Sequence, residues 1–183
     1  QIDPVRTLAA RYYTDPAVYQ AEVDGLLSHT WQLACHGAQL KRAGDYFAFD
    51  IAGQSLFCVR GHDMVVRTFY NVCQHRAHEL VAGSGNTRVI VCPYHAWTYE
   101  LTGGLRGGPN IKAVEGFRRA DICLTEVRTE DFNGFIFVNL DKDAEPMDVW
   151  YPNVRAELRE FVPHIDALEP LEFVSVPENC NWK

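Results

Sequence analysis

Two short motifs, each with one cysteine and one histidine, constrain this chain more than any other part of its sequence. The first is Cys73-Gln74-His75, and the second, after residues 76–91, is Cys92-Pro93-Tyr94-His95. Cysteine sulfur and histidine nitrogen are ligands of zinc sites and of iron–sulfur clusters. We therefore expect two tight loops, joined by a hairpin-sized insert, to place four ligands around one metal centre.

These four ligands fit two kinds of metal site. A 2Fe–2S cluster with two cysteines on one iron and two histidines on the other needs this inventory, and its neutral imidazoles raise the reduction potential to about −150 to +300 mV. A structural zinc ion would accept the same residues, but zinc sites favour C-x-x-C pairs, whereas the order here is C-x-H and C-x-x-H. The spacing favours the cluster, with structural zinc as the alternative.

Composition and charge exclude several other classes of protein. The net charge is −7 and basic residues do not gather in one segment, so the chain is a poor candidate for binding nucleic acid or anionic lipid. No apolar run approaches the roughly 18–20 residues that span a bilayer, and no signal-peptide pattern occurs, so we expect a cytoplasmic location. With 47% hydrophobic residues the chain needs no disulfides for its core. The remaining cysteines are therefore expected to pack as small apolar side chains; they are Cys35, Cys58, Cys123 and Cys180.

Apolar periodicity divides the chain into a helical arm, a β-rich middle and a mixed end. A capping residue and a proline predict a helix over 16–29, with apolar residues at helical spacing. Short β-branched and aromatic runs separated by glycine turns then indicate an antiparallel β module. The predicted strands are 46–51, 55–60, 64–71, 88–91, 97–100, 122–128 and 134–140, followed by a helix over 154–162 and a strand over 171–176.

The two motifs resemble the Rieske motif in the version found in the oxygenase components of Rieske non-haem iron oxygenases. The resemblance extends over Cys73-Gln74-His75-Arg76 and Cys92-Pro93-Tyr94-His95-Ala96-Trp97. The resemblance covers most of the chain, because further segments are similar to those that frame the motif in this family: Arg11-Tyr12-Tyr13-Thr14, Trp31, Ala43-Gly44-Asp45-Tyr46, Phe69-Tyr70-Asn71-Val72 and Gly134-Phe135-Ile136-Phe137-Val138-Asn139. The chain departs from the family at Ala77, where glycine is usual, so the loop backbone is expected to differ slightly there; Ala96 also stands in place of the commoner glycine.

The resemblance implies a mainly β fold with three parts. An antiparallel Rieske 2Fe–2S domain is expected over 32–140, preceded by a helical arm over 1–31. A linker and the truncated start of an α+β catalytic domain are expected over 141–183.

The resemblance also implies the ligand set. Cys73 and Cys92 would bind the buried iron, and His75 and His95 the outer iron, nearer the surface from which electrons leave. Four neighbouring side chains are expected to shield the cluster and tune it by hydrogen bonding, with plain packing as the alternative; they are Arg76, His78, Tyr94 and Trp97.

No catalytic residue is assigned within these 183 residues. In the family, a mononuclear non-haem iron held by two histidines and a carboxylate activates O₂ in a larger C-terminal domain. The corresponding D/N-x-x-H-x(3–4)-H stretch does not occur here, although Asn181-Trp182-Lys183 resembles the segment that opens that domain. The implied partners are an NAD(P)H-dependent flavin and iron–sulfur reductase, with or without a ferredoxin, and two further copies in a homotrimer.

The substrate class rests on analogy alone. Ala96 within Cys92–Tyr99 favours the branch that acts on quaternary ammonium compounds, namely the carnitine, glycine betaine, stachydrine and choline monooxygenases and demethylases. Aromatic-ring hydroxylating dioxygenases are the competing branch. A stand-alone Rieske ferredoxin, an electron carrier, is the other alternative, which the helical arm before residue 32 and the residues after Leu140 disfavour.

Overall fold

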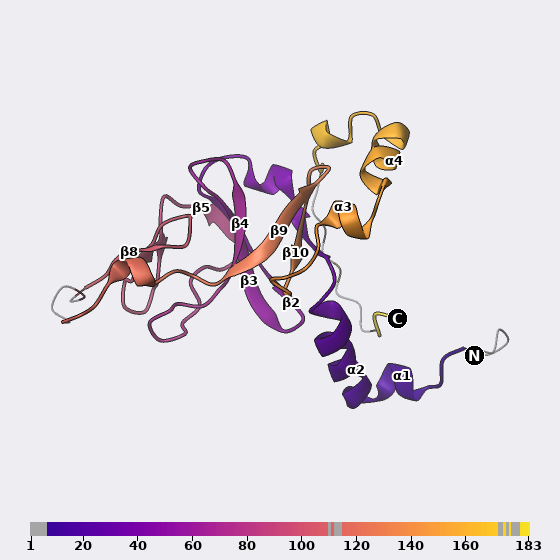
Figure 1. The fold of residues 1–183 in the computed structure, drawn as a ribbon, viewed down its shortest axis with the longest axis horizontal. Helices are drawn as coiled ribbons and strands as arrows, with labels where there is room; N and C mark the ends of the chain where they lie inside the picture. Colours follow the sequence, from indigo (N-terminus) through magenta and orange to yellow (C-terminus); the bar gives the residue numbers. More distant parts are fainter. Residues whose placement is uncertain (1–6, 110, 112–114, 172–173, 175, 177–179) are drawn as a thin grey trace.

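The fold is built on a curved, seven-stranded antiparallel sheet with strand order β1-β10-β9-β4-β3-β2-β5 (Figure 1). The computed structural model describes residues 7–109, 111, 115–171, 174, 176 and 180–183. The strands of this sheet are β1 (Gln32–His36), β2 (Asp45–Ile51), β3 (Gln54–Arg60), β4 (Val66–Tyr70), β5 (Ser84–Asn86), β9 (Glu126–Phe132) and β10 (Phe135–Asn139). The antiparallel β architecture predicted from the sequence is confirmed.

Strand β3, which lies between β4 and β2, connects two parts of the hydrophobic core. Phe57 and Val59 are fully buried and pack in the same core group as Cys73 and Cys92. Cys58, between them in sequence, faces the opposite side of the sheet and packs in a different group. Successive side chains of a strand point to opposite faces of the sheet. One face of β3 therefore packs against the core group that holds the two motif cysteines, and the other face packs against the core group that contains Cys58.

The two motifs lie in a lobe, residues 71–125, that is inserted between β4 and β9. It contains a small sheet of order β6-β7-β8, made of Ile90–Val91, Thr98–Tyr99 and Leu105–Gly107. The lobe leaves and rejoins the main sheet at neighbouring residues, since Phe69 in β4 is paired with Glu126 in β9. β5 also belongs to the lobe in sequence and pairs with β2, which ties the lobe to the main sheet at a second place.

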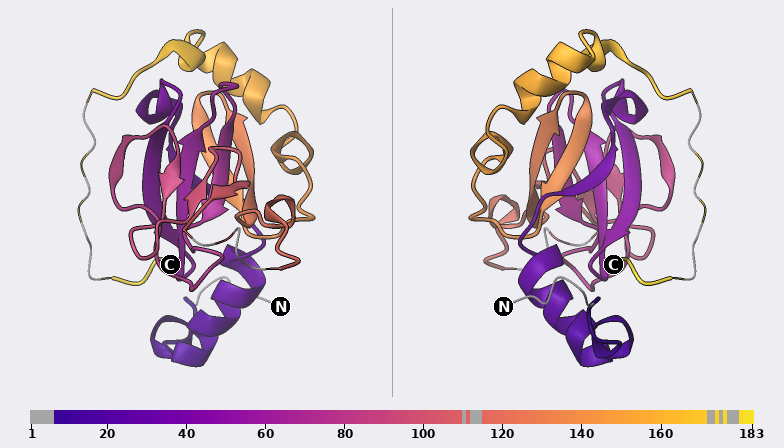
Figure 2. Two further views of the ribbon diagram at one scale, coloured as in Figure 1. Left: turned by 90° about the vertical axis from the view of Figure 1, so that its left-hand side faces the viewer. Right: turned by 90° about the vertical axis from the view of Figure 1, so that its right-hand side faces the viewer.

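The α-helices flank the sheet away from this lobe (Figure 1). α1 (Arg11–Thr14) and α2 (Pro16–Glu22) form the arm, where Asp15 caps α2 by accepting a hydrogen bond from the Ala17 N–H. After β10 come α3 (Met147–Trp150) and α4 (Val154–Phe161), and Figure 2 shows α4 and α2 at opposite rims of the sheet. Short 3₁₀ helices span 37–40, 119–121 and 165–167. Among the helices described, none is long and apolar enough to cross a membrane.

Residues 181–183 lie against the helical arm. The carboxylate of Glu22 accepts hydrogen bonds from Trp182 Nε1 at 3.0 Å and from Lys183 Nζ at 2.5 Å. Asn181 Nδ2 donates to the carbonyl of Tyr13 at 2.8 Å. The ion pair is largely shielded, because the side chains of Lys183 and Glu22 are 13% and 19% exposed.

Several predicted elements differ from the structure. β1 and β5 were not predicted, because β1 is broken by an irregularity between Leu33 and Cys35 and β5 contains no apolar residue. The helix predicted over 16–29 is α-helical only to Glu22 and continues as a π-helix over Val23–Leu27, which contains a glycine.

Two strands predicted in the second half of the chain also differ from the structure. The strand predicted over 122–128 begins only at Glu126, because the bridge between Gly104 and Cys123 holds the preceding residues in the lobe. Of the strand predicted over 171–176, the described residues 171, 174 and 176 are not in a strand, and the others lie outside the described residues.

Candidate metal centre

The loops Cys73–His78 and Cys92–Trp97 have the same backbone hydrogen bonding. In each loop the cysteine N–H donates to the carbonyl five residues on, at 2.9 and 2.8 Å, and the cysteine carbonyl accepts from the N–H four residues on, at 2.9 Å in both. The residues at this fourth position, Ala77 and Ala96, have φ of 53° and 56°. Glycine adopts this left-handed region without the steric cost that alanine incurs. The two alanines thus keep the loop conformation that glycine would favour.

The two cysteines lie deep in the lobe. Cys73 and Cys92 are each 2% exposed, are free thiols and belong to the same core group. The Cys73 sulfur lies 3.2 Å from the hydroxyl of Tyr99. A metal ion bound by these sulfurs would therefore be shielded from water by the apolar core.

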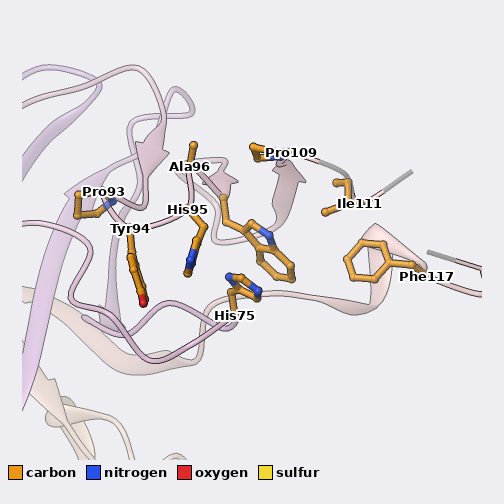
Figure 3. A pocket seen from close by; sticks show the side chains of 9 residues that line it. His75, Pro93, Tyr94, His95, Ala96, Pro109, Ile111 and Phe117 are labelled. Atoms are coloured by element: carbon orange, nitrogen blue, oxygen red, sulfur yellow. The ribbon is translucent and has the colours of Figure 1, made fainter. Parts of the chain in front are cut away.

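The two histidines meet at the outer side of the same loops. The rings of His75 and His95 lie 4.8 Å apart between centroids, with their planes at 73° (Figure 3). Nδ1 of His95 is buried and has no hydrogen-bond partner within the described residues, which is uncommon for a buried nitrogen. Removal from water, with smaller contributions from His75 and Arg76, lowers the pKa of His95. The neutral imidazole that results is the form that binds a metal.

This set of donors matches the ligand requirement of a cluster with two irons. In a 2Fe–2S cluster each iron takes only two protein ligands, so two separate pairs are what the group requires. Two buried sulfurs on one side and two imidazoles on the other fit that requirement.

Two aromatic residues of the predicted surroundings contact the histidines directly. Trp97 is 9% exposed and stacks on His75, with ring centroids 4.7 Å apart and planes at 12°. Tyr94 is 56% exposed, and its ring lies 3.7 Å from that of His95. Trp97 therefore covers one histidine from inside the lobe, whereas Tyr94 covers the other from the solvent side.

The two charged or polar neighbours are His78 and Arg76. His78 contacts Tyr94, with ring centroids 5.5 Å apart, and its Nδ1 lies 2.6 Å from the carbonyl oxygen of Glu79. Arg76 is exposed and acts on His95 through its positive charge. Apart from the backbone hydrogen bond from Cys73 to the His78 carbonyl, neither residue makes a hydrogen bond to the candidate ligands among the described residues.

Two residues beside the site were not singled out from the sequence. Tyr99 accepts a hydrogen bond from the Gln74 N–H at 3.0 Å, so it joins β7 to the first loop. Asn71 is fully buried, and its side-chain oxygen accepts from the N–H groups of Leu80 and Val81, both at 3.1 Å. The sequence did offer a signal for each of them. Tyr99 lies two residues after Trp97 in a predicted strand, so both side chains are expected on the same face, and Asn71 is a polar residue two positions before Cys73.

A cavity of about 590 Å³ opens beside the two histidines. One side comes from the motif loops and the other from the segment after β8, and the lining is mostly apolar (Figure 3). The residues that line it are His75, Pro93, Tyr94, His95, Ala96, Trp97, Pro109, Ile111 and Phe117.

Residues 30–118 match the family described as the Rieske [2Fe-2S] domain. The chain is 36% identical over 178 residues to the carnitine monooxygenase oxygenase subunit of Escherichia coli strain K12, covering 97% of this chain and 48% of that protein. It is 30% identical to the biphenyl 2,3-dioxygenase subunit alpha of Rhodococcus jostii strain RHA1, over 96% of this chain and 39% of that protein. The chain spans about half, or less, of the length of these relatives.

Solved structures show the same relationship. A quaternary ammonium Rieske monooxygenase crystallised with L-carnitine superposes with a TM-score of 0.84 at 35% identity, covering 89% of this chain and 47% of that one. Naphthalene 1,2-dioxygenase from Rhodococcus sp. superposes with a TM-score of 0.77 at 28% identity, covering 84% of this chain and 36% of that one.

Proposed function

This chain belongs to the Rieske oxygenase family, and on that premise we propose that Cys73 and Cys92 bind one iron of a 2Fe–2S cluster while His75 and His95 bind the other. The observation that carries the proposal is the pair of matched loops, which place two buried thiols and two adjacent imidazoles in one lobe. When bound, the cluster supplies a one-electron redox centre. We further propose the domain bounds 1–31, 32–140 and 141–183 for the arm, the Rieske domain and the segment that follows.

The protein's own residues prepare this centre for electron transfer. The core around Cys73 and Cys92 excludes water from the sulfur side, while His75 is exposed and His95 is half-buried beside the cavity. Two neutral imidazoles in place of two thiolates leave the site less negative, so an added electron is better tolerated. The site is therefore suited to accept an electron from a donor protein and release it through the histidine side.

We propose that the electron serves an oxygenase that uses O₂ and NAD(P)H-derived electrons to hydroxylate or N-demethylate a small quaternary ammonium compound. The support is that carnitine monooxygenase subunits match this chain at 33–36% identity, against 30–32% for the alpha subunits of two aromatic dioxygenases. The oxygenase chemistry itself would take place at a mononuclear non-haem iron. An aromatic-ring hydroxylating dioxygenase is the second candidate, supported by the match to biphenyl and naphthalene dioxygenases.

The proposed partners are an NAD(P)H-dependent flavin and iron–sulfur reductase and further copies of the same subunit in a homotrimer. The solved quaternary ammonium Rieske monooxygenase is described with inter-subunit electron transfer, which supports an assembly in which one subunit's cluster serves another.

The test is low-temperature EPR of the dithionite-reduced protein, with the visible spectrum of the same sample before reduction. We expect a rhombic signal of low average g, typical of a histidine-ligated 2Fe–2S cluster. A colourless, EPR-silent protein with one zinc ion per chain would instead make this a structural metal site and end the oxygenase proposal.

The substrate class is tested separately with the oxygenase and its reductase. We expect quaternary ammonium compounds such as L-carnitine and glycine betaine to stimulate O₂ uptake with release of a hydroxylated or demethylated product. Biphenyl and naphthalene serve as the matched aromatic panel, and product formation from these alone would favour the second candidate.

A further inference from the structure

Within the described residues, the imidazole of His75 is oriented by contacts with two other rings. No hydrogen bond to its ring occurs within the described residues, although ligating histidines usually donate their second ring N–H to a protein acceptor. Its ring contacts are the parallel stack on Trp97, 12° from coplanar, and the edge contact with His95. The orientation of His75 therefore depends on the position of the Trp97 indole.

Trp97 is held in turn by the segment that follows β8. Phe117 packs edge-on against it, with centroids 5.9 Å apart and planes at 76°. The backbone of Gly108 lies against the five-membered ring of the indole: a methyl group at Gly108 would lie 2.7 Å from Cδ1 and 3.2 Å from Nε1 of Trp97. No side chain fits there unless the indole moves. Glycine at 108 is thus required for room, since its φ lies outside the left-handed region.

We propose that Gly108 and Trp97 are positioning residues for His75. Because it has no side chain, Gly108 leaves room for the Trp97 indole, and the indole holds the His75 ring in the orientation in which it binds the cluster. The inference rests on the proposed function, because it presumes that His75 is a ligand. It adds a residue outside both motifs, Gly108, to the set on which the metal centre depends.

The test compares alanine at two adjacent glycines in the iron-loaded protein. At Gly107 a methyl group would meet nothing within 4 Å, so Gly107→Ala is the matched control for Gly108→Ala. We expect Gly108→Ala and Trp97→Ala to release iron to a chelator about tenfold faster than the unchanged protein, at the lower end of the effect of outer partners on metal affinity. Both should also shift the g anisotropy of the reduced cluster, whereas Gly107→Ala should change neither.

A conservative variant separates positioning from general destabilisation. Trp97→Phe keeps an aromatic ring beside His75 and is expected to restore most of the iron retention and the EPR line shape that Trp97→Ala loses. The inference is overturned if Gly108→Ala matches Gly107→Ala in both readouts, or if Trp97→Phe is as impaired as Trp97→Ala. The unchanged protein is measured in the same series, so absence of the cluster signal there counts against the proposed function, not against this inference alone.

Discussion

The hydroxyl of Tyr99 lies 3.2 Å from the sulfur of Cys73 and 3.0 Å from the backbone nitrogen of Gln74. The Gln74 N–H donates to the hydroxyl oxygen, so the hydroxyl proton is free to point at the sulfur, and a metal-bound thiolate has no proton of its own. Burial, together with the neighbouring Cys73, raises the pKa of Tyr99 and keeps it protonated. Tyr99 is thus placed to donate a hydrogen bond to a candidate ligand.

Tyr99→Phe is expected to lower the reduction potential of the cluster. A hydrogen bond to sulfur stabilises the more negative, reduced state, and its loss is worth about 1 kcal/mol, or about 40 mV for one electron. Redox titration followed by EPR measures the change. An unchanged potential in a variant that keeps its full iron content would mean that Tyr99 only packs.

Glycine at the two left-handed alanines is expected to stabilise the protein. Ala77→Gly and Ala96→Gly each remove a strain of about 1–2 kcal/mol, part of which is offset by the greater freedom of glycine in the unfolded chain. A net gain of about 0.5–1 kcal/mol per site is expected in urea unfolding of the metal-free protein. The control is Ala48→Gly inside β2, which should destabilise; loss of stability in all three variants would contradict the loop argument.

His95→Cys is expected to keep a cluster but to lower its potential. A third thiolate adds negative charge, so the potential should fall from the histidine-ligated range towards the value of about −400 mV of four-cysteine clusters. Redox titration and iron analysis of the variant test this. If the variant retained the original potential, His95 would not be a ligand.

The contact between Glu22 and residues 181–183 is expected to open in acid. The hydrogen bond from Lys183 lowers the pKa of the Glu22 carboxyl from its ordinary value of 4.5. A lowered carboxyl pKa stabilises the contact above the ordinary value, and this stabilisation is lost as the pH falls through the pKa of the folded protein.

The opening is measured by the fluorescence of Trp182 between about pH 6 and about pH 3. This signal is the fluorescence of the unchanged protein minus that of Trp182→Phe, which contains only the other tryptophans. In Glu22→Gln the charge that titrates is gone, so the transition should be absent. A transition of the same size in Glu22→Gln would assign it to another group.

The sequence was most informative where local spacing alone sets the structure. The C-x-H and C-x-x-H spacings were sufficient to predict two tight loops, and the glycine at position 53 to predict the β2–β3 hairpin, whose turn has φ of 51° and 75°. The polar strand β5 could not be predicted, because it forms only through pairing with β2.

Contacts between distant segments of the lobe could not be predicted from the sequence either. Tyr99 reaches Cys73 from another strand, and Gly108 touches Trp97 only after the segment following β8 folds back. No periodicity or spacing encodes such long-range contacts, which is why the candidate ligands and Trp97 were singled out from the sequence but the contacts of Tyr99 and Gly108 were not.

Because Phe69 is paired with Glu126, the lobe begins and ends at neighbouring positions and can be exchanged as one continuous segment. Residues directly opposite in an antiparallel pair have Cα atoms about 4.5–5.5 Å apart, so the two ends of residues 71–125 can be spliced into another scaffold without a shift of strand register. A graft would also need an edge strand in the recipient to receive β5, as β2 does here. Exchange of this segment between relatives would therefore give one protein's main sheet a metal centre with the reduction potential of another.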